Sequence, residues 1–185
     1  MVKASDEKYS ALSASIDLDE KAFFKHPEYE NLQGSFSISM LKNNNIQNVY
    51  IFPTGNIGLI VNSETLGFSI LDRLQNSKDS LKELHVLGVK NSENDVVPAL
   101  ESILINESID CVVIAIFGDL TFCDEVFEKI NKLASIKRIR IPVVVFLNGT
   151  NIDLVDLNVL AHNLHYSNNL EYALLKCALL VKKSN

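Results

Sequence analysis

The side chains best placed to do chemistry lie in a turn after the apolar run at positions 111–117. Gly118 ends this run, and Asp119, Leu120 and Thr121 follow it, with Asp124 at capping-box spacing from Thr121. A buried strand that ends in a glycine turn before a helix often binds anions, because unpaired backbone N–H groups point at the ligand. The pattern therefore indicates an anion-binding turn that carries a carboxylate.

The carboxylate of Asp119 argues against a phosphate in this turn. Two like charges about 4 Å apart repel by roughly 4 kcal/mol at an effective dielectric near 20. The helix dipole contributes roughly 0.3–1 kcal/mol, which is too little to offset that repulsion. Asp119 or Thr121 can instead accept the free helix amides, which stabilises a domain by about 0.5–2 kcal/mol. We therefore predict that this helix caps itself and that the turn is closed to phosphate.

Other polar residues lack partners that would make them a site. His162 and His165 have no acid or cysteine at ligand spacing, so we interpret them as surface histidines, and His85 as a residue at the edge of the core. The acidic cluster of Asp17, Asp19 and Glu20 is typical of a solvated stretch. The sequence contains no P-loop and no Gly-x-Gly-x-x-Gly. We predict no catalytic residue, no metal site and no cofactor.

The three cysteines, Cys111, Cys123 and Cys177, do not have metal-ligand spacing. An odd number of cysteines in apolar surroundings indicates reduced, buried thiols. None has a basic neighbour in sequence that would make it a nucleophile.

Strands and helices alternate around the turn. We expect strands near positions 49–52 and 57–61, joined by a tight turn as a hairpin, and further strands at 84–89, 111–117, 141–147 and 164–166. A second capping box, Ser92 with Asp95, begins one of the helices. Apolar stripes indicate five helices: Leu66, Ile70, Leu71 and Leu74; Val96, Val97, Leu100, Ile103 and Leu104; Cys123, Phe127, Ile130 and Leu133; Leu154, Leu157 and Ala161; Leu170, Leu174, Cys177, Ala178 and Val181.

This alternation predicts the α/β class, with a doubly wound, mostly parallel sheet of about five strands and helices on both faces, as in flavodoxin-like domains. Positions 1–45 are polar and mixed, so we predict an extended N-terminal arm there and the folded domain at positions 46–185.

Composition narrows the classes of partner. Hydrophobic residues make up 47% of the 185-residue chain and charged residues 22%, which is typical of a soluble globular protein. A formal charge of -6 without a basic run argues against nucleic acid and anionic membrane surfaces as partners. No apolar stretch is long enough to insert across a membrane.

Several segments, in order, resemble the carboxy-terminal CoA-ligase domain of the succinyl-CoA synthetase (succinate–CoA ligase) beta subunit, which ATP-citrate lyase relatives share. They are Gly-Asn-Ile-Gly at positions 55–58 with its continuation to Asn62, Ile-Phe-Gly at 116–118 with Cys-Asp at 123–124, and Ile-Pro-Val-Val-Val at 141–145. Positions 16–27 look like the linker that leaves the family's ATP-grasp domain. The resemblance runs from about position 13 to the end of the chain.

The resemblance implies a role in interconverting succinyl-CoA and nucleotide-bound energy through a phosphohistidine on an alpha subunit. In the family this domain supplies half of the alpha–beta interface and a helix N-terminus that cradles the phosphate. Carried over by position, the substrate-binding residues are Asn62, Gly118, Asp119, Leu120 and Thr121. The implied partner is an alpha-type subunit or a multi-subunit complex, and the implied location is the mitochondrial matrix, or otherwise the cytoplasm.

The chain departs from the family at most working positions. Only about a dozen residues precede the linker, so the ATP-grasp domain is expected to be missing, and the family's magnesium-binding aspartate falls on Ser13. The family's small Gly-Ala-Gly run is replaced by Ser63, Glu64 and Thr65, and its triple-glycine turn is reduced to Gly88, Val89 and Lys90. A glycine and an arginine of the family's anion turn fall on Asp119 and Phe122, and an arginine and a glutamate after the later strand fall on Phe146 and Asn148. Bulk at such turns prevents close backbone approach to a ligand.

These departures favour a pseudoenzyme, a degenerate beta-type domain retained as an interaction or structural subunit of a larger, mitochondrial assembly. A second hypothesis is the carboxy-terminal half of a split beta subunit, with succinate–CoA ligase activity only as part of a complex. A third hypothesis is a CoA or nucleotide sensor that uses the carboxyl edge of the sheet.

Overall fold

The computed structural model describes residues 2–3, 9–10, 37–38, 46–74, 80–88, 92–137, 139–158 and 160–184. The chain divides into two compact units, Met1–Ser35 and Phe36–Asn185. In the first unit, β1 (Val2–Lys3) pairs antiparallel with β2 (Tyr9–Ser10). Ser13, the acidic cluster, the predicted linker at 16–27, Val89 and Lys90 lie outside the described residues.

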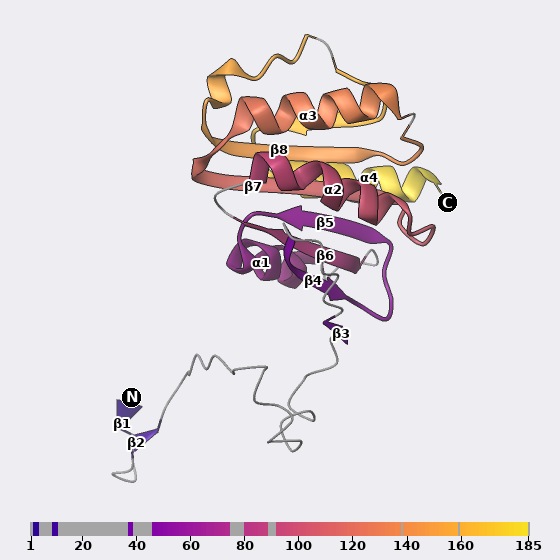
Figure 1. Ribbon diagram of the computed structural model, residues 1–185. Coiled ribbons are helices and arrows are strands. Elements are labelled where there is room, and N and C mark those ends of the chain that lie inside the picture. Colours follow the sequence, from indigo (N-terminus) through magenta and orange to yellow (C-terminus); the bar gives the residue numbers. More distant parts are fainter. Residues whose placement is uncertain are drawn as a thin grey trace. The chain divides into compact units, whose positions relative to one another are not determined.

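The second unit contains a sheet of seven strands with helices on both faces (Figure 1). The strand order is β3-β4-β6-β5-β7-β8-β9. The strands β6, β5, β7, β8 and β9 run parallel to one another. At one edge of the sheet, β4 pairs antiparallel with β6, and β3 pairs antiparallel with β4. The strands are β3 (Ser37–Ile38), β4 (Ile46–Ile51), β5 (Ile57–Val61), β6 (Leu81–Leu87), β7 (Cys111–Phe122), β8 (Val143–Thr150) and β9 (Leu164–Ser167). The predicted doubly wound fold with five parallel strands is confirmed.

The predicted hairpin between the first two strands of this sheet is wrong, because β6 lies between β4 and β5. Val49 of β4 faces His85 of β6, and Ile60 of β5 faces His85 from the other side. The connection passes close to the start of β6 at Gly55, which has a φ of 134°. A Cβ there would lie 2.3 Å from the Leu81 carbonyl oxygen, so glycine is required.

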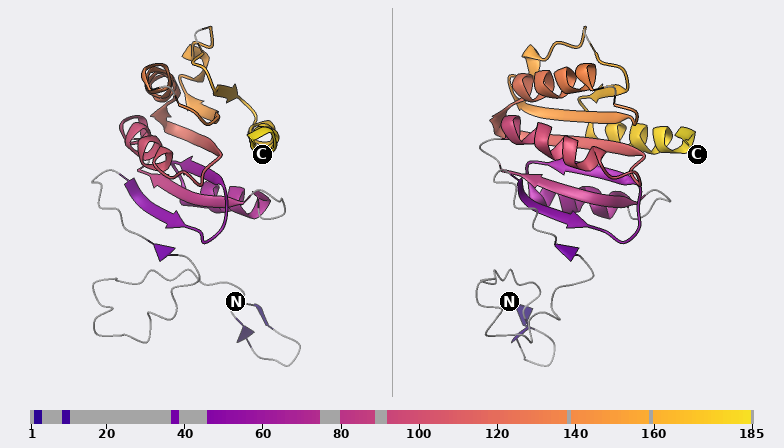
Figure 2. Two further views of the ribbon diagram at one scale, coloured as in Figure 1. Left: turned by 90° about the vertical axis from the view of Figure 1, so that its right-hand side faces the viewer. Right: turned by 45° about the vertical axis from the view of Figure 1, so that its right-hand side comes forward.

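Two helices cover each face of the sheet (Figure 2). The helices α2 (Ser92–Leu104) and α3 (Cys123–Ile136) share one apolar cluster with the sheet. The helices α1 (Glu64–Leu74) and α4 (Leu170–Ser184) share the cluster on the opposite face. Buried residues of the predicted stripes include Ile70, Leu71, Leu74, Val96, Leu100, Ile103, Cys123, Phe127, Ile130, Leu133, Leu174, Cys177 and Val181. These four predicted helices are confirmed.

The helix predicted around Leu154, Leu157 and Ala161 is wrong. In the described part of this stretch the only helical turn is the 3-10 turn η3 (Ile152–Leu154), and both leucines are exposed. Asn151 before it adopts a left-handed conformation with φ 60°. The carboxylate of Asp156 accepts the backbone N–H of Asn158 at 2.9 Å, a local bond that competes with helix formation. Across the described residues, no helix has the length and apolarity to cross a membrane.

Candidate functional site

The predicted anion turn is a bulge in β7 and not the first turn of a helix. Gly118 pairs with Gly149 of β8, and the next pair is Phe122 with Thr150, so residues 119–121 leave the ladder. Gly118 has a φ of 128°, which fits the predicted glycine turn. A Cβ on Gly149 would lie 2.2 Å from the Gly118 carbonyl oxygen, so the two strands meet at the bulge with no room for a side chain.

The predicted capping box of Thr121 and Asp124 is wrong. Helix α3 begins at Cys123, and its N-cap residue, Phe122, makes no side-chain cap hydrogen bond. The bulge delays the helix, which moves Thr121 away from the N-cap position. The side chain of Asp119 lies outside the described part, so its predicted effect on a phosphate stays a prediction.

Asn62, the residue that the resemblance assigned to substrate, bonds to the bulge from the end of β5. It is 2% exposed, and its Oδ1 accepts the backbone N–H of Phe117 at 3.1 Å. Its Nδ2 donates to the Phe117 carbonyl at 3.0 Å and to the Thr121 hydroxyl at 3.3 Å. Because both ends of the amide are already bonded within the protein, Asn62 stabilises the bulge and does not face outward toward a ligand.

The side chains that do face outward here are apolar. Phe117, Leu120 and Phe122 are 57%, 63% and 45% exposed, and we call these three residues the apolar rim. The structure thus places Leu120 and Gly118 at the carboxyl edge as the sequence predicts, but it buries Asn62 and Thr121. Sequence reasoning treated Phe122 as the loss of a family arginine and missed that it joins an exposed apolar group.

The thiol nearest this edge is chemically quiet. Burial, together with the charge of Asp124, raises the pKa of Cys123 to about 11, so the thiol stays protonated at neutral pH. Cys111, Cys123 and Cys177 are all buried and free, as predicted. Burial is also the main cause that raises the pKa of Tyr166 above its ordinary value, followed by the charge that Cys123 carries once it ionises.

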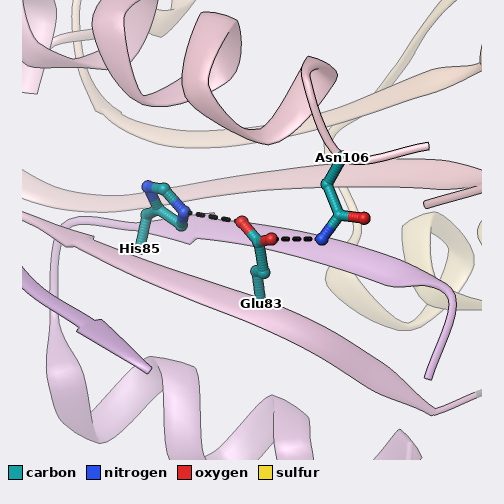
Figure 3. A network of polar contacts seen from close by, with 3 residues as sticks. All are labelled: Glu83, His85 and Asn106. Carbon is teal, nitrogen blue, oxygen red and sulfur yellow. Dashed lines mark hydrogen bonds and ion pairs between the residues drawn. The ribbon is translucent and has the colours of Figure 1, made fainter. Parts of the chain in front are cut away.

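A second polar network, formed by Glu83, His85 and Asn106, lies beneath α2 (Figure 3). It was not predicted from the sequence. His85 is fully buried, and its Nε2 lies 3.1 Å from Oε2 of Glu83. The other oxygen of Glu83 accepts a hydrogen bond from the amide of Asn106, in the connection after α2. The prediction that His85 lies at the core edge is wrong, because β4 and β5 flank β6 on both sides. The signal in the sequence is the spacing of Glu83 and His85, which places both on one face of a strand.

The carboxyl of Glu83 is ionised more easily than usual. Burial alone would raise its pKa, but hydrogen bonds from His85 and Asn106, with the charges of His85 and Lys82, outweigh burial and lower the pKa below its ordinary value. The network therefore holds a buried carboxylate that fixes the α2–β7 connection to β6.

Two further histidines, His162 and His165, lie within the described residues. His162 is exposed and His165 is half-buried. Burial, followed by the charges of Lys176 and His162, lowers the pKa of His165 and favours its neutral form. Among the described residues, no group of three or more histidine, cysteine, aspartate or glutamate side chains could hold a metal ion.

The order of the parallel strands, numbered along the chain, is 2-1-3-4-5, which with helices on both faces defines a flavodoxin-like domain. No family model matches the chain. It is 30% identical over 155 residues to the ADP-forming succinate–CoA ligase subunit beta of Desulforapulum autotrophicum, covering 83% of this chain and 40% of the relative. The same subunit of Chlamydia caviae is 32% identical over 145 residues, with 77% and 37% covered.

A further relative, the subunit from Cupriavidus necator, is 27% identical over 157 residues, with 83% of this chain and 40% of the relative covered. The chain is therefore a homologue of the carboxy-terminal CoA-ligase domain of succinate–CoA ligase beta subunits, and it spans about 40% of the length of these relatives.

Proposed function

We propose that this chain is a non-catalytic, beta-type succinate–CoA ligase protein that binds a protein partner through the apolar rim. The observation that carries the proposal is that, at the carboxyl edge, the polar side chain is bonded internally and the apolar side chains are exposed. Asn62 is bonded to the bulge, while the aromatic rings of Phe117 and Phe122 are exposed around it. Exposed aromatic groups that can become dry on contact are typical anchors of protein interfaces.

The partner in this proposal is an alpha-type subunit or a larger assembly that contains one, and the location is mitochondrial. Both follow from the family resemblance. The rim lies at the edge where parallel sheets most often bind their ligands, and here its three side chains supply contact area instead of hydrogen-bond donors. Such a surface fits a protein better than it fits a phosphate.

The test is binding of the purified chain to an alpha subunit of succinate–CoA ligase from the same organism, measured by calorimetry. The double variant Leu120→Asn with Phe122→Asn should weaken binding by at least about tenfold, because it removes two anchors worth about 1.4 kcal/mol or more together. The control is Leu179→Asn on the outer face of α4, an equally exposed leucine. Equal binding by the rim and control variants would exclude the rim as the interface.

The split-subunit hypothesis is the second candidate, and retention of Asn62 and of the left-handed Gly118 favours it. It requires a separate ATP-grasp chain. The discriminating experiment is purification of the native complex, followed by a succinate–CoA ligase assay. Activity that depends on this chain and on an ATP-grasp chain would replace the pseudoenzyme proposal. An inactive complex that contains an alpha-type subunit supports it.

The sensor hypothesis is tested by thermal unfolding with CoA or a nucleotide. A ligand at a hundred times its Kd adds about 2.7 kcal/mol to the free energy of unfolding, which is readily measured. The proposed binding role predicts no such shift.

A further inference from the structure

The last helix, α4, is apolar on its outer side as well as on its inner side. Tyr172, Leu175 and Leu179 are 58%, 64% and 60% exposed. They lie three and then four residues apart, so they form one stripe along the helix, which we call the α4 stripe. The opposite side of α4 packs on the sheet through Ala173, Leu174, Cys177 and Val181. Apolar side chains therefore cover two opposite sides of this helix.

Helix α3 shows how a solvated outer side looks in the same domain. Its outward residues include Glu125, Glu128 and Lys132, all of which are exposed. A helix that is apolar all round is typical of one that is buried on both sides. In Figure 2, no described element of the second unit covers the outer side of α4. The α4 stripe therefore has the character of a contact surface for another chain.

A hollow beside the first half of the stripe enlarges this apolar surface. It has a volume of about 690 Å³, and its lining includes Leu157, Tyr166, Tyr172 and Leu175. Leu157 is itself 47% exposed. The hollow therefore gives room for side chains of a helix that packs along the stripe.

The spacing of the stripe is that of a coiled-coil seam. Tyr172, Leu175 and Leu179 take the a, d and a positions of a heptad repeat. In this register the sheet-facing residues of α4 fall at the b, c and f positions, on the side away from the seam. The two positions that flank the seam, g and e, are Glu171 and Lys176. These are the only charged residues between positions 170 and 181.

The two flanking charges make α4 complementary to a second copy of itself. In a parallel pair of helices, a g residue faces the e residue that lies five positions further along the other helix. Glu171 and Lys176 are five positions apart and opposite in sign, so two copies form two such pairs about a two-fold axis. Glu171 also pairs with Arg73 of its own chain, but both side chains are at least half exposed, and such pairs contribute little. Glu171 therefore remains available to a lysine of a second copy.

We propose that the α4 stripe is a self-association surface, on which two copies of this chain pack their α4 helices in parallel. The stripes of the two copies form the dry contact, and the pairs of Glu171 with Lys176 set the orientation. The seam covers only about two helical turns, so the dimer should be weak, with a Kd of about 100 μM. This contact is separate from the apolar rim and does not depend on the proposed partner.

The first test is sedimentation equilibrium of the full chain at concentrations below and above the expected Kd. Leu175→Glu should weaken self-association by at least about tenfold, because it places a charge in the middle of the dry contact. The control is Ile105→Glu, which makes the same kind of change at an isoleucine that is 81% exposed, and it should leave association unchanged. Glutamate is a good helix former, so Leu175→Glu should keep α4 intact, which circular dichroism checks.

The second test addresses the parallel orientation. Glu171→Lys and Lys176→Glu should each weaken self-association by about threefold or more, because each places like charges opposite one another. An equimolar mixture of the two variants should associate as well as the unchanged chain, because the mixed pair again faces each lysine with a glutamate. A purely structural role of either residue would not produce this rescue.

The two proposed contacts are separated by exchanging their variants. Leu175→Glu and Leu179→Asn should weaken self-association but leave binding of the alpha-type subunit unchanged. The double variant Leu120→Asn with Phe122→Asn should have the opposite effects. Failure of one proposal is therefore recognised without the other.

Three results would overturn the proposal. The first is a chain that stays monomeric at about ten times the expected Kd, or equal association of Leu175→Glu and Ile105→Glu. The second is unweakened association of both single charge variants, because an antiparallel pair would face Glu171 with Glu171. The third is loss of binding to the alpha-type subunit in Leu175→Glu, which would assign the stripe to that partner.

Discussion

The two ends of the central sheet both bond their buried polar groups within the protein, but they differ in the side chains that they expose. At the carboxyl end, the amide of Asn62 and the hydroxyl of Thr121 bond to each other and to the chain, and apolar side chains face outward. At the amino end, Glu83 and Asn106 bond inside, while the cations Lys137 and Arg140 border an aliphatic groove.

The exposed side chains at the carboxyl end differ from those usual in a parallel sheet. The carboxyl end normally binds charged ligands, because the helices that follow each strand present free N–H groups there. Here a bulge separates β7 from α3, and the exposed residues around it are apolar. The comparison teaches that a parallel sheet can bond the polar groups of its carboxyl end internally and present apolar side chains there instead.

The largest expected effect on stability comes from Asn62, whose side chain bonds to the bulge at the carboxyl end. Asn62→Leu should lower the free energy of unfolding by about 3 kcal/mol, because it leaves the backbone groups of Phe117 and the Thr121 hydroxyl without this partner, and a lost buried bond costs about 1–3 kcal/mol. Urea denaturation measures the loss. Asn158→Ala, in the exposed loop after β8, is the control and should change stability by less than about 0.5 kcal/mol.

The close approach at the bulge gives the next effect. Gly149→Ala should destabilise by about 1–3 kcal/mol, because the new Cβ collides with the Gly118 carbonyl. Gly88→Ala is the matched control, since its Cβ would meet only an Asp95 oxygen at 3.8 Å. If the two alanine variants unfolded at the same urea concentration, the bulge would be looser than the structure indicates.

The buried carboxylate near the amino end predicts a pH dependence. The pKa of Glu83 is lower in the folded protein than its ordinary value of 4.5, so its contribution to stability is present above about pH 4.5 and is lost as pH falls through the folded pKa. Glu83→Gln should therefore lower the free energy of unfolding at neutral pH by about 1–3 kcal/mol. It should also make the further loss of stability below about pH 4.5 smaller than in the unchanged protein, because this carboxylate no longer titrates. Urea midpoints between neutral and acid pH measure this, with the exposed Glu125→Gln as control. If Glu83→Gln lost as much stability between neutral and acid pH as the unchanged protein, the lowered pKa of Glu83 would be contradicted.

The smallest effect on stability belongs to the apolar rim. Leu120→Ser should change the free energy of unfolding by less than about 0.5 kcal/mol, because Leu120 is 63% exposed and lies in the bulge, outside the ladder. The same variant should weaken binding of the alpha-type partner. A large loss of stability would mean that this side chain packs within the domain and is not available as an anchor.

Patterns along the chain were enough to predict much of this protein. Apolar runs and stripes determined the class of fold, five parallel strands and four of the helices, because burial of one helix face or two strand faces leaves a local period. The buried, reduced state of Cys111, Cys123 and Cys177 followed in the same way. Gly118 was recognised as a turn because a break in an apolar run is also local.

Only the tertiary structure decided which residues meet. Strand order placed β6 between β4 and β5, which no local pattern reveals. Asn62 and Thr121 are 59 positions apart, and Glu83 and Asn106 are 23 apart, so their bonds depend on how strands and connections are arranged in space. The stripe of Leu154 and Leu157 has helical spacing but is exposed. A periodic pattern becomes a stable helix when a surface is available to bury it, and packing supplies that surface.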